Sequence, residues 1–149
     1  MLRLGRLGFL KRLSDNSKKI YINIPSENRY IKKVSSRIIA DLEACKVSDE
    51  KAFDVKLCVE EAVRNAIVHG NHSERGKTVR TAYRIDGGTI TIEVEDEGVG
   101  FDHNMLPDPT DPGHIMRNSG RGVYLIKKLM DKVEFNAAGN KITMSKNIK

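Results

Sequence analysis

Residues 57–71 of the chain read LCVEEAVRNAIVHGN, and this stretch decides the fold. Its apolar residues, together with Val55 just before the stretch, recur at intervals of three and four positions. This is the pattern of a helix with one buried stripe. The stripe consists of Val55, Cys58, Val59, Ala62, Val63, Ala66 and Ile67. The stretch therefore predicts an amphipathic helix that is closed by Gly70 and Asn71.

A row of boundary positions runs along the edge of this stripe. Glu61 and Asn65 belong to the row, and side chains four apart lie one above the other on a helix. A carboxylate and an amide oxygen in one line suit a magnesium ion that is bound to a phosphate. Taken alone, such a row is more often ordinary solvated surface. The row comprises Leu57, Glu61, Asn65 and His69, and the solvated face comprises Lys56, Glu60 and Arg64.

The composition is that of an ordinary globular domain. With 149 residues the chain has the length of one domain, and 39% of its residues are hydrophobic and 31% charged. Its apolar runs are far shorter than a membrane span. Cys45 and Cys58 fall on apolar helix positions without metal-ligand spacing, so we expect two small core residues in a reducing cytoplasm.

The net charge of +6 is concentrated at the N-terminus. Residues 1–19 contain six basic residues and one acidic residue, a net +5, which leaves +1 for the rest. The body is nearly neutral, so we expect no direct binding of nucleic acid by the domain itself. The sequence predicts a flexible basic tail over residues 1–18, with contact to anionic lipid or an acidic partner as the alternative, and one domain over residues 19–149.

Two helices are expected beside a first strand. Residues 19–24 alternate as a strand that ends at Pro25, and Ser26 is predicted to cap the next helix. Ser48 is predicted to cap the central helix, because the two acidic residues behind it favour a helix N-terminus. The apolar positions expected in the first of these helices are Ile31, Val34, Ile38, Leu42 and Cys45.

Two hairpins supply the other strands. Residues 86–88, Asp-Gly-Gly, join the first pair, and residues 133–136 and 141–146 form a closing hairpin. The strand after the first turn alternates apolar and polar residues, so one face is buried and the other wet. The apolar positions are Ile90, Ile92 and Val94. The pattern predicts an α+β fold with a mostly antiparallel sheet and helices on one face.

Asp96 continues the buried row of that strand. A carboxylate there is costly to bury unless something donates hydrogen bonds to it, which favours a ligand with an N–H edge. It begins the stretch DEGVGFD, in which Gly98 and Gly100 allow a tight turn that lies close against a flat ligand. A calcium loop is disfavoured because no further acidic residues follow at the required spacing.

A proline-rich segment separates Asp96 from a second glycine pair. Residues 102–119 hold three of the four prolines, which is typical of a functional lid or of a disordered segment. Arg117 lies near its end, where a cation can reach a phosphate. Residues 119–122, SGRG, then open a helix, and glycines there leave N–H groups free to point at an anion.

The order of these motifs resembles the ATP-binding fold shared by gyrase, the heat-shock chaperone, histidine kinases and the MutL mismatch-repair protein. The motifs are E-x-x-x-N on a helix, D-x-G-x-G after a strand and G-x-G opening a helix, and the likeness covers roughly residues 19–146. The chain looks most like the small stand-alone anti-sigma factor serine kinases of bacteria. They share the E-A-V-x-N-A-I-x-H-G run, here residues 61–70, and the S-G-x-G run followed by L-M-D, here residues 119–122 and 129–131.

This resemblance implies a two-layer sandwich of the histidine-kinase-like ATPase (Bergerat) type and a role for each motif. Glu61 resembles the catalytic base that orients the acceptor hydroxyl, and Asn65 the magnesium ligand. Asp96 resembles the aspartate that accepts a hydrogen bond from the adenine amino group. Either Arg117 or Arg121 is expected to meet the γ-phosphate. The implied nucleotide-binding residues are Asn65, Asp96, Gly98, Gly100, Arg117, Gly120, Arg121 and Gly122.

One position departs from the resemblance. Many relatives place a threonine directly after the glycine of the last hairpin, near adenine, and this chain has Asn140 there. The expected site therefore leaves that hairpin out.

The resemblance also implies a function. We expect a cytoplasmic, ATP- and Mg²⁺-dependent protein-serine kinase that phosphorylates a STAS-type anti-sigma factor antagonist and sequesters a sigma factor. Relatives commonly dimerise, so a homodimer is a further implied assembly. The alternative is a nucleotide-gated binding module without significant kinase activity. A detached histidine-kinase domain is disfavoured because Val68 stands where those kinases usually have lysine, and gyrase-like or chaperone-like ATPases because no transducer domain follows.

Overall fold

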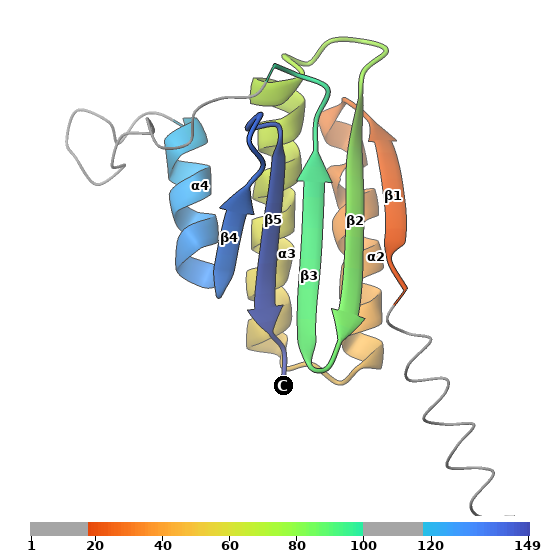
Figure 1. The fold of residues 1–149 in the computed structure, drawn as a ribbon. Coiled ribbons are helices and arrows are strands. Elements are labelled where there is room, and N and C mark those ends of the chain that lie inside the picture. Colours follow the sequence, from red (N-terminus) through yellow and green to blue (C-terminus); the bar gives the residue numbers. More distant parts are fainter. Residues whose placement is uncertain (1–17, 100–117) are drawn as a thin grey trace, which may run out of the picture.

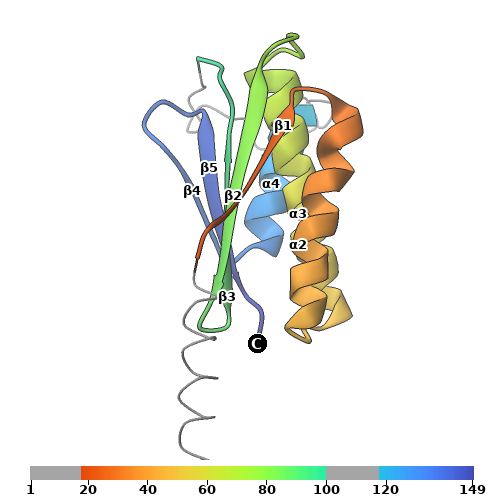
Figure 2. The same cartoon turned by 90° about the vertical axis from the view of Figure 1, so that its right-hand side faces the viewer.

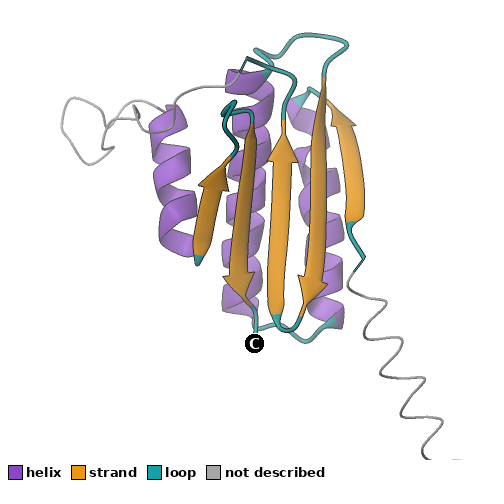
Figure 3. Cartoon of the chain, viewed as in Figure 1, coloured by secondary structure: helices purple, strands orange, loops and turns teal. Residues whose placement is uncertain are grey.

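A five-stranded antiparallel sheet carries the described helices on one of its faces (Figures 1 and 2). The computed structural model describes residues 18–99 and 118–149. The strands are β1 (Ile20–Pro25), β2 (Thr78–Asp86), β3 (Thr89–Glu95), β4 (Lys132–Phe135) and β5 (Lys141–Asn147), in the spatial order β1-β2-β3-β5-β4. The long helices are α2 (Ile31–Ala44), α3 (Asp49–Asn65) and α4 (Asn118–Leu129); in Figure 3 α2 and α3 lie behind the sheet and α4 lies beside β4. This arrangement confirms the predicted α+β sandwich.

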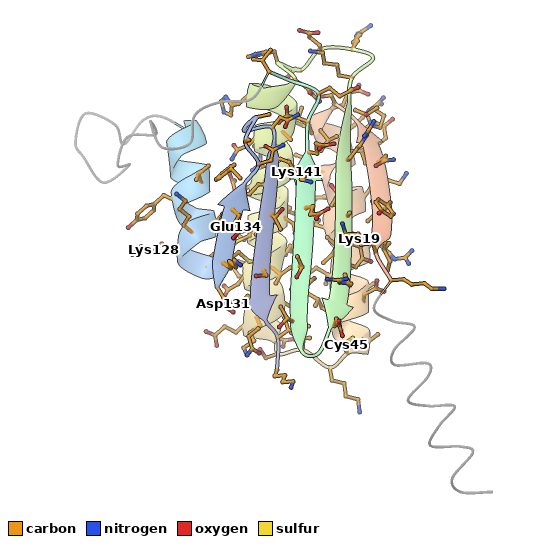
Figure 4. The ribbon with its side chains drawn as sticks, viewed as in Figure 1. Lys19, Cys45, Lys128, Asp131, Glu134 and Lys141 are labelled. Atoms are coloured by element: carbon orange, nitrogen blue, oxygen red, sulfur yellow. The ribbon has the colours of Figure 1, made fainter. Side chains whose placement is uncertain are left out.

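The core lies between the sheet and the helices. The alternation predicted for β3 is confirmed, because its apolar residues are buried and the polar residues between them are half-buried on the other face. That other face carries ion pairs, such as Lys19 Nζ to Glu93 Oε2 at 3.0 Å; Figure 4 labels Lys19, Glu134 and Lys141 there. The core includes Ile24, Val34, Ile38, Leu42, Val55, Val59, Val63, Ile67, Ile90, Ile92, Ile126 and Met144.

The central helix starts and ends as predicted. The Oγ atom of Ser48 accepts a hydrogen bond from the N–H of Lys51 at 3.3 Å, which is the expected N-cap. The buried stripe of α3 is confirmed. After Asn65 the helix widens into one π-helical turn, η2 (Ala66–Gly70), and the N–H of Asn71 closes it on the carbonyl of Ala66 at 2.8 Å. Turns of this kind project the helix end differently from a regular α-helix.

Two predictions about the first helix are wrong. Ser26 does not cap it, because the helix is entered through a 3₁₀ turn, η1 (Asn28–Tyr30), and Ser26 is instead buried. Cys45 is exposed, because α2 ends at Ala44 and the apolar pattern no longer follows a helix beyond that point (labelled in Figure 4). Cys58 is buried, as expected.

Glu60 is not on a solvated face either. Its Oε1 atom accepts a hydrogen bond from Ser35 Oγ at 3.0 Å, so the residue is half-buried where α2 packs against α3. Lys56 and Arg64 are exposed, as predicted.

The tail and most of the lid lie outside the described residues. The boundaries predicted at residues 1–18 and 102–119 therefore stay predictions, except that Asn118 and Ser119 already belong to α4. Within residues 18–99 and 118–149, none of the helices has the length and apolar content required to cross a membrane.

Candidate functional site

In the candidate site, Gly122 of α4 lies against the C-terminal half of α3. A Cβ atom placed on Gly122 would lie 2.9 Å from Glu61 Oε2 and 2.9 Å from Asn65 Nδ2. The main chain of α4 therefore approaches the E-x-x-x-N pair closely, and a larger residue at position 122 would force one of these two side chains to shift. A glycine inside a helix is about 1 kcal/mol less favourable than alanine, so this close approach has a measurable cost to the helix.

The two oxygens of the Glu61 carboxylate have different surroundings. Its Oε1 atom pairs with Arg64 Nη1 at 2.5 Å, one turn further along α3. Its Oε2 atom faces Gly122. The side chain is 24% exposed, so the carboxylate is partly shielded but still reachable. One oxygen is thus fixed by a cation while the other is directed at the start of α4, where the glycine motif was predicted to bind phosphate.

Asp96 lies at the other end of the site, one residue beyond β3. Its Oδ1 atom accepts a hydrogen bond from the N–H of Gly98 at 2.8 Å. The pKa of Asp96 is raised above its ordinary value, first by burial; the Gly98 hydrogen bond opposes the rise and the charge of Glu95 adds to it. A half-buried carboxylate of this kind gains from a ligand that donates a hydrogen bond to it.

The π-helical turn η2 ends against Asp96. A side chain on Gly70 would overlap the Asp96 carboxylate, and one on Gly98 would overlap the carbonyl oxygen of Gly70. Both glycines are therefore required by close packing. The end of the turn that follows the E-x-x-x-N helix therefore meets the loop at Asp96 and Gly98.

Asn71 is a supporting residue that sequence reasoning read only as a helix end. It is fully buried, and its Nδ2 atom donates to Ser26 Oγ at 3.2 Å and to the carbonyl of Thr78 at 2.9 Å. Its Oδ1 atom accepts from the N–H of Glu97 at 2.7 Å. One amide thus fixes the loop that begins at Asp96 to the ends of β1 and β2. No local sequence signal identifies such partners.

The hairpin that was left out of the expected site touches it. The N–H of Asp96 donates to the carbonyl of Asn140 at 2.9 Å, and Asn140 Nδ2 donates to the carbonyl of Asp96 at 3.2 Å. Asn140 therefore supports Asp96, although it stands where many relatives have threonine.

The remaining predicted residues are only partly placed. Gly100 and Arg117 lie outside the described residues. Gly120 and Arg121 lie in the first turn of α4, and the position of the Arg121 side chain is not described. The choice between the two arginines as γ-phosphate ligand therefore stays open.

The residues around Asn65 fit a magnesium ion that is shared with a nucleotide. No group of three or more histidine, cysteine or acidic residues able to hold a metal occurs in the part of the chain that the structure describes. Magnesium does not need such a group, because it commonly takes one or two protein oxygens and completes its shell with phosphates and water. The Asn65 amide, next to the Glu61 carboxylate and Gly122 of α4, offers a donor of this type.

Comparison with known proteins finds matches over most of the chain. Residues 24–146 match the family model of the histidine kinase-like ATPase domain. The anti-sigma F factor of Clostridium perfringens strain SM101 is 33% identical over 134 residues, which cover 87% of this chain and 92% of that protein. The serine-protein kinase RsbW of Oceanobacillus iheyensis is 29% identical over 136 residues, covering 87% of this chain and 86% of its own length.

A solved structure supports the fold. The crystal structure of the RsbU and RsbW domains of Rv1364c from Mycobacterium tuberculosis has a TM-score of 0.63 to this chain at 16% identity. The match covers 88% of this chain and 32% of that one. At this level of identity the likeness concerns the fold alone, and it agrees with the predicted two-layer arrangement of sheet and helices.

Proposed function

This chain belongs to the histidine kinase-like ATPase domain family and, within it, to the anti-sigma factor serine-protein kinases, and we propose that it transfers the γ-phosphate of ATP to a serine of a partner protein. The family makes it an anti-sigma regulator with an ATPase-like domain. The observation that carries the finer proposal is the contact of Gly122 with both Glu61 and Asn65, which joins a phosphate-binding helix start to a carboxylate and an amide.

In the proposed complex the nucleotide extends from Asp96 to α4. The adenine amino group donates to the Asp96 carboxylate, and the triphosphate lies on the N–H groups around Gly120 and Gly122. Asn65 holds Mg²⁺, which would neutralise charge on the transferring group.

The proposed transfer is an in-line displacement. The serine Oγ forms a bond to the γ-phosphorus as the bond to the β,γ-bridging oxygen breaks, and ADP leaves. Glu61 orients the serine hydroxyl and receives its proton. Base assistance of this kind contributes on the order of 10²–10⁴ in rate.

The partners in this proposal follow from the relatives' names. The Clostridium relative is named for opposing a sigma factor, and the Oceanobacillus relative for a serine-protein kinase activity. We assign to this chain a sigma factor that it sequesters and a STAS-type antagonist that it phosphorylates. We further propose that both interactions take place in the cytoplasm and that the chain, like relatives that commonly dimerise, can form a homodimer.

Phosphotransfer to a cognate antagonist tests this function. Wild-type protein incubated with Mg²⁺ and γ-labelled ATP should label the antagonist on serine. Glu61→Ala should lower transfer by roughly 10²- to 10⁴-fold while ATP still binds. Glu134→Ala, on the open face of the sheet and paired with Lys132, is the matched control and should behave as wild type. Unchanged transfer by Glu61→Ala would refute the assignment of the base.

A second candidate is a nucleotide-gated binding module without significant turnover. The ion pair between Arg64 and Glu61 favours it, because it occupies one oxygen of the carboxylate that a kinase needs. In this case ATP sets the affinity for the partner by a population shift. The same experiment separates the two functions, because this one yields nucleotide-dependent complexes and no phosphoserine.

A further inference from the structure

The tip of the β4–β5 hairpin is closed by two asparagines that bond to each other. Asn136 Nδ2 donates to Asn140 Oδ1 at 2.7 Å, and the N–H of Asn140 donates to Asn136 Oδ1 at 3.0 Å. The same Asn136 oxygen also accepts from the N–H of Lys141 at 3.1 Å. Gly139, with φ at +79°, makes the turn possible. The two amides therefore hold each other in one orientation.

Of these two asparagines, Asn140 is the one with described contacts to Asp96. Because the oxygen of its side chain is occupied by Asn136, its Nδ2 atom is directed at the Asp96 carbonyl, 3.2 Å away. Its main-chain carbonyl accepts from the Asp96 N–H at 2.9 Å. Flipping the amide would lose both side-chain bonds, which fixes the assignment of its two ends.

The contact matters because Asp96 lies beyond the regular sheet. The ladder between β3 and β5 ends with the pair Glu95 and Lys141. From there on, the main chain of Asp96 is fixed by Asn140, and its carboxylate by the Gly98 N–H. The direction of the carboxylate is thus set by contacts on both sides.

We propose that Asn136 and Asn140 form an amide clamp that positions Asp96 to recognise the amino group of adenine, so that the hairpin tip sets the base specificity of the site. This inference rests on the proposed function, since it assumes that Asp96 faces adenine. Both asparagines are positioning residues. Threonine, which many relatives have at the position of Asn140, lacks the amide nitrogen and cannot make the same two side-chain bonds.

Two nucleotides that differ at the amino group test the clamp. Calorimetric titrations with ATP and with inosine triphosphate, which carries no amino group, should show that wild type prefers ATP. Asn140→Ala removes hydrogen bonds to the Asp96 carbonyl and to Asn136, so that Asp96 is no longer held in place before ATP binds. We therefore expect ATP affinity to fall roughly 3- to 10-fold and inosine triphosphate affinity to stay within about 2-fold.

Companion variants make the test specific. Asn136→Ala should act in the same direction, because it releases the Asn140 amide. Asn140→Asp keeps the shape of the side chain but replaces its Nδ2 donor with an oxygen. This variant tests the clamp if circular dichroism shows that Asn140→Ala does not fold. Asn147→Ala is the control, since that side chain accepts from the N–H of Lys149 after the far end of β5 and should leave both affinities unchanged.

The outcomes separate the clamp from the function. If the folded clamp variants weaken both nucleotides equally or leave the preference for ATP unchanged, the inference is wrong while the proposed function stands. If wild type binds both nucleotides equally well, Asp96 does not recognise the amino group and the inference is also wrong. If wild type binds neither, the nucleotide site itself is wrong and the proposed function fails with it.

Discussion

Replacing Asp96 by asparagine should separate folding from nucleotide binding. Burial raises the pKa of this carboxyl group in the folded protein above its ordinary value of 3.8. The protonated carboxyl group therefore favours the folded state. This contribution to the free energy of unfolding is complete below pH 3.8 and is lost as the pH rises through the folded pKa. At pH 7 the charge is therefore a net cost to the folded protein without ligand. Asparagine keeps an oxygen for the Gly98 N–H and removes the charge. We expect Asp96→Asn to be at least as stable as wild type at pH 7.

ATP binding should change in the opposite direction. The adenine amino group would lose a charged acceptor, and a hydrogen bond to a charged group is worth about 1.5–3 kcal/mol. At about 1.4 kcal/mol for each factor of ten, the dissociation constant for ATP should rise roughly 10- to 150-fold. The advantage in stability should shrink as the pH falls, because the wild-type carboxyl group becomes protonated.

Calorimetry with Mg²⁺ and ATP and urea unfolding at pH 7 measure the two effects. Asp86→Asn, at the exposed β2–β3 turn, is the control and should change neither. An Asp96→Asn variant that binds ATP within 2-fold of wild type would contradict the role of Asp96. A clear loss of stability in that variant would contradict the reasoning about its charge.

Three further perturbations test other parts of the account. Gly122→Ala should leave α4 helical, because alanine is the better helix former by about 1 kcal/mol. It should nevertheless lower phosphotransfer about 10²-fold, because the added methyl group displaces the Glu61 and Asn65 side chains. An unchanged rate would contradict this close packing. Lys146→Met removes the 2.6 Å bond to the Leu129 carbonyl and should lower the free energy of unfolding by about 1–3 kcal/mol in urea, which an unchanged midpoint would exclude. The pKa values of Cys58 and Tyr83 are both raised to about 12, chiefly by burial, from ordinary values of 9.0 and 10.0. The unfolded chain therefore releases these protons first, and urea midpoints should fall as the pH rises from about 9 towards 12, whereas a flat profile would argue against both burials.

The sequence predicts the elements well where the signal is local. The apolar spacing of α3, the Ser48 cap and the glycine turn between β2 and β3 each depend on a few neighbouring residues, and all three are confirmed. The Cys45 prediction was wrong because helical spacing in a sequence does not show where the helix stops.

The parts that sequence could not predict depend on distant partners. Ser26 and Asn71 are 45 positions apart and hydrogen-bond in the core, so neither residue's role is visible from its neighbours. Glu60 looked solvated until α2 was placed beside it. Asn140 was set aside because it differs from the threonine of many relatives, but it contacts Asp96 through both main chain and side chain.

A crystal structure with Mg²⁺ and a non-hydrolysable ATP analogue tests the central claim most directly. It should show the adenine amino group within hydrogen-bond distance of the Asp96 carboxylate, the metal on the Asn65 amide oxygen, and Glu61 facing the γ-phosphate. An analogue bound at another site would contradict the account. So would an analogue whose adenine does not contact Asp96 and whose metal does not contact Asn65.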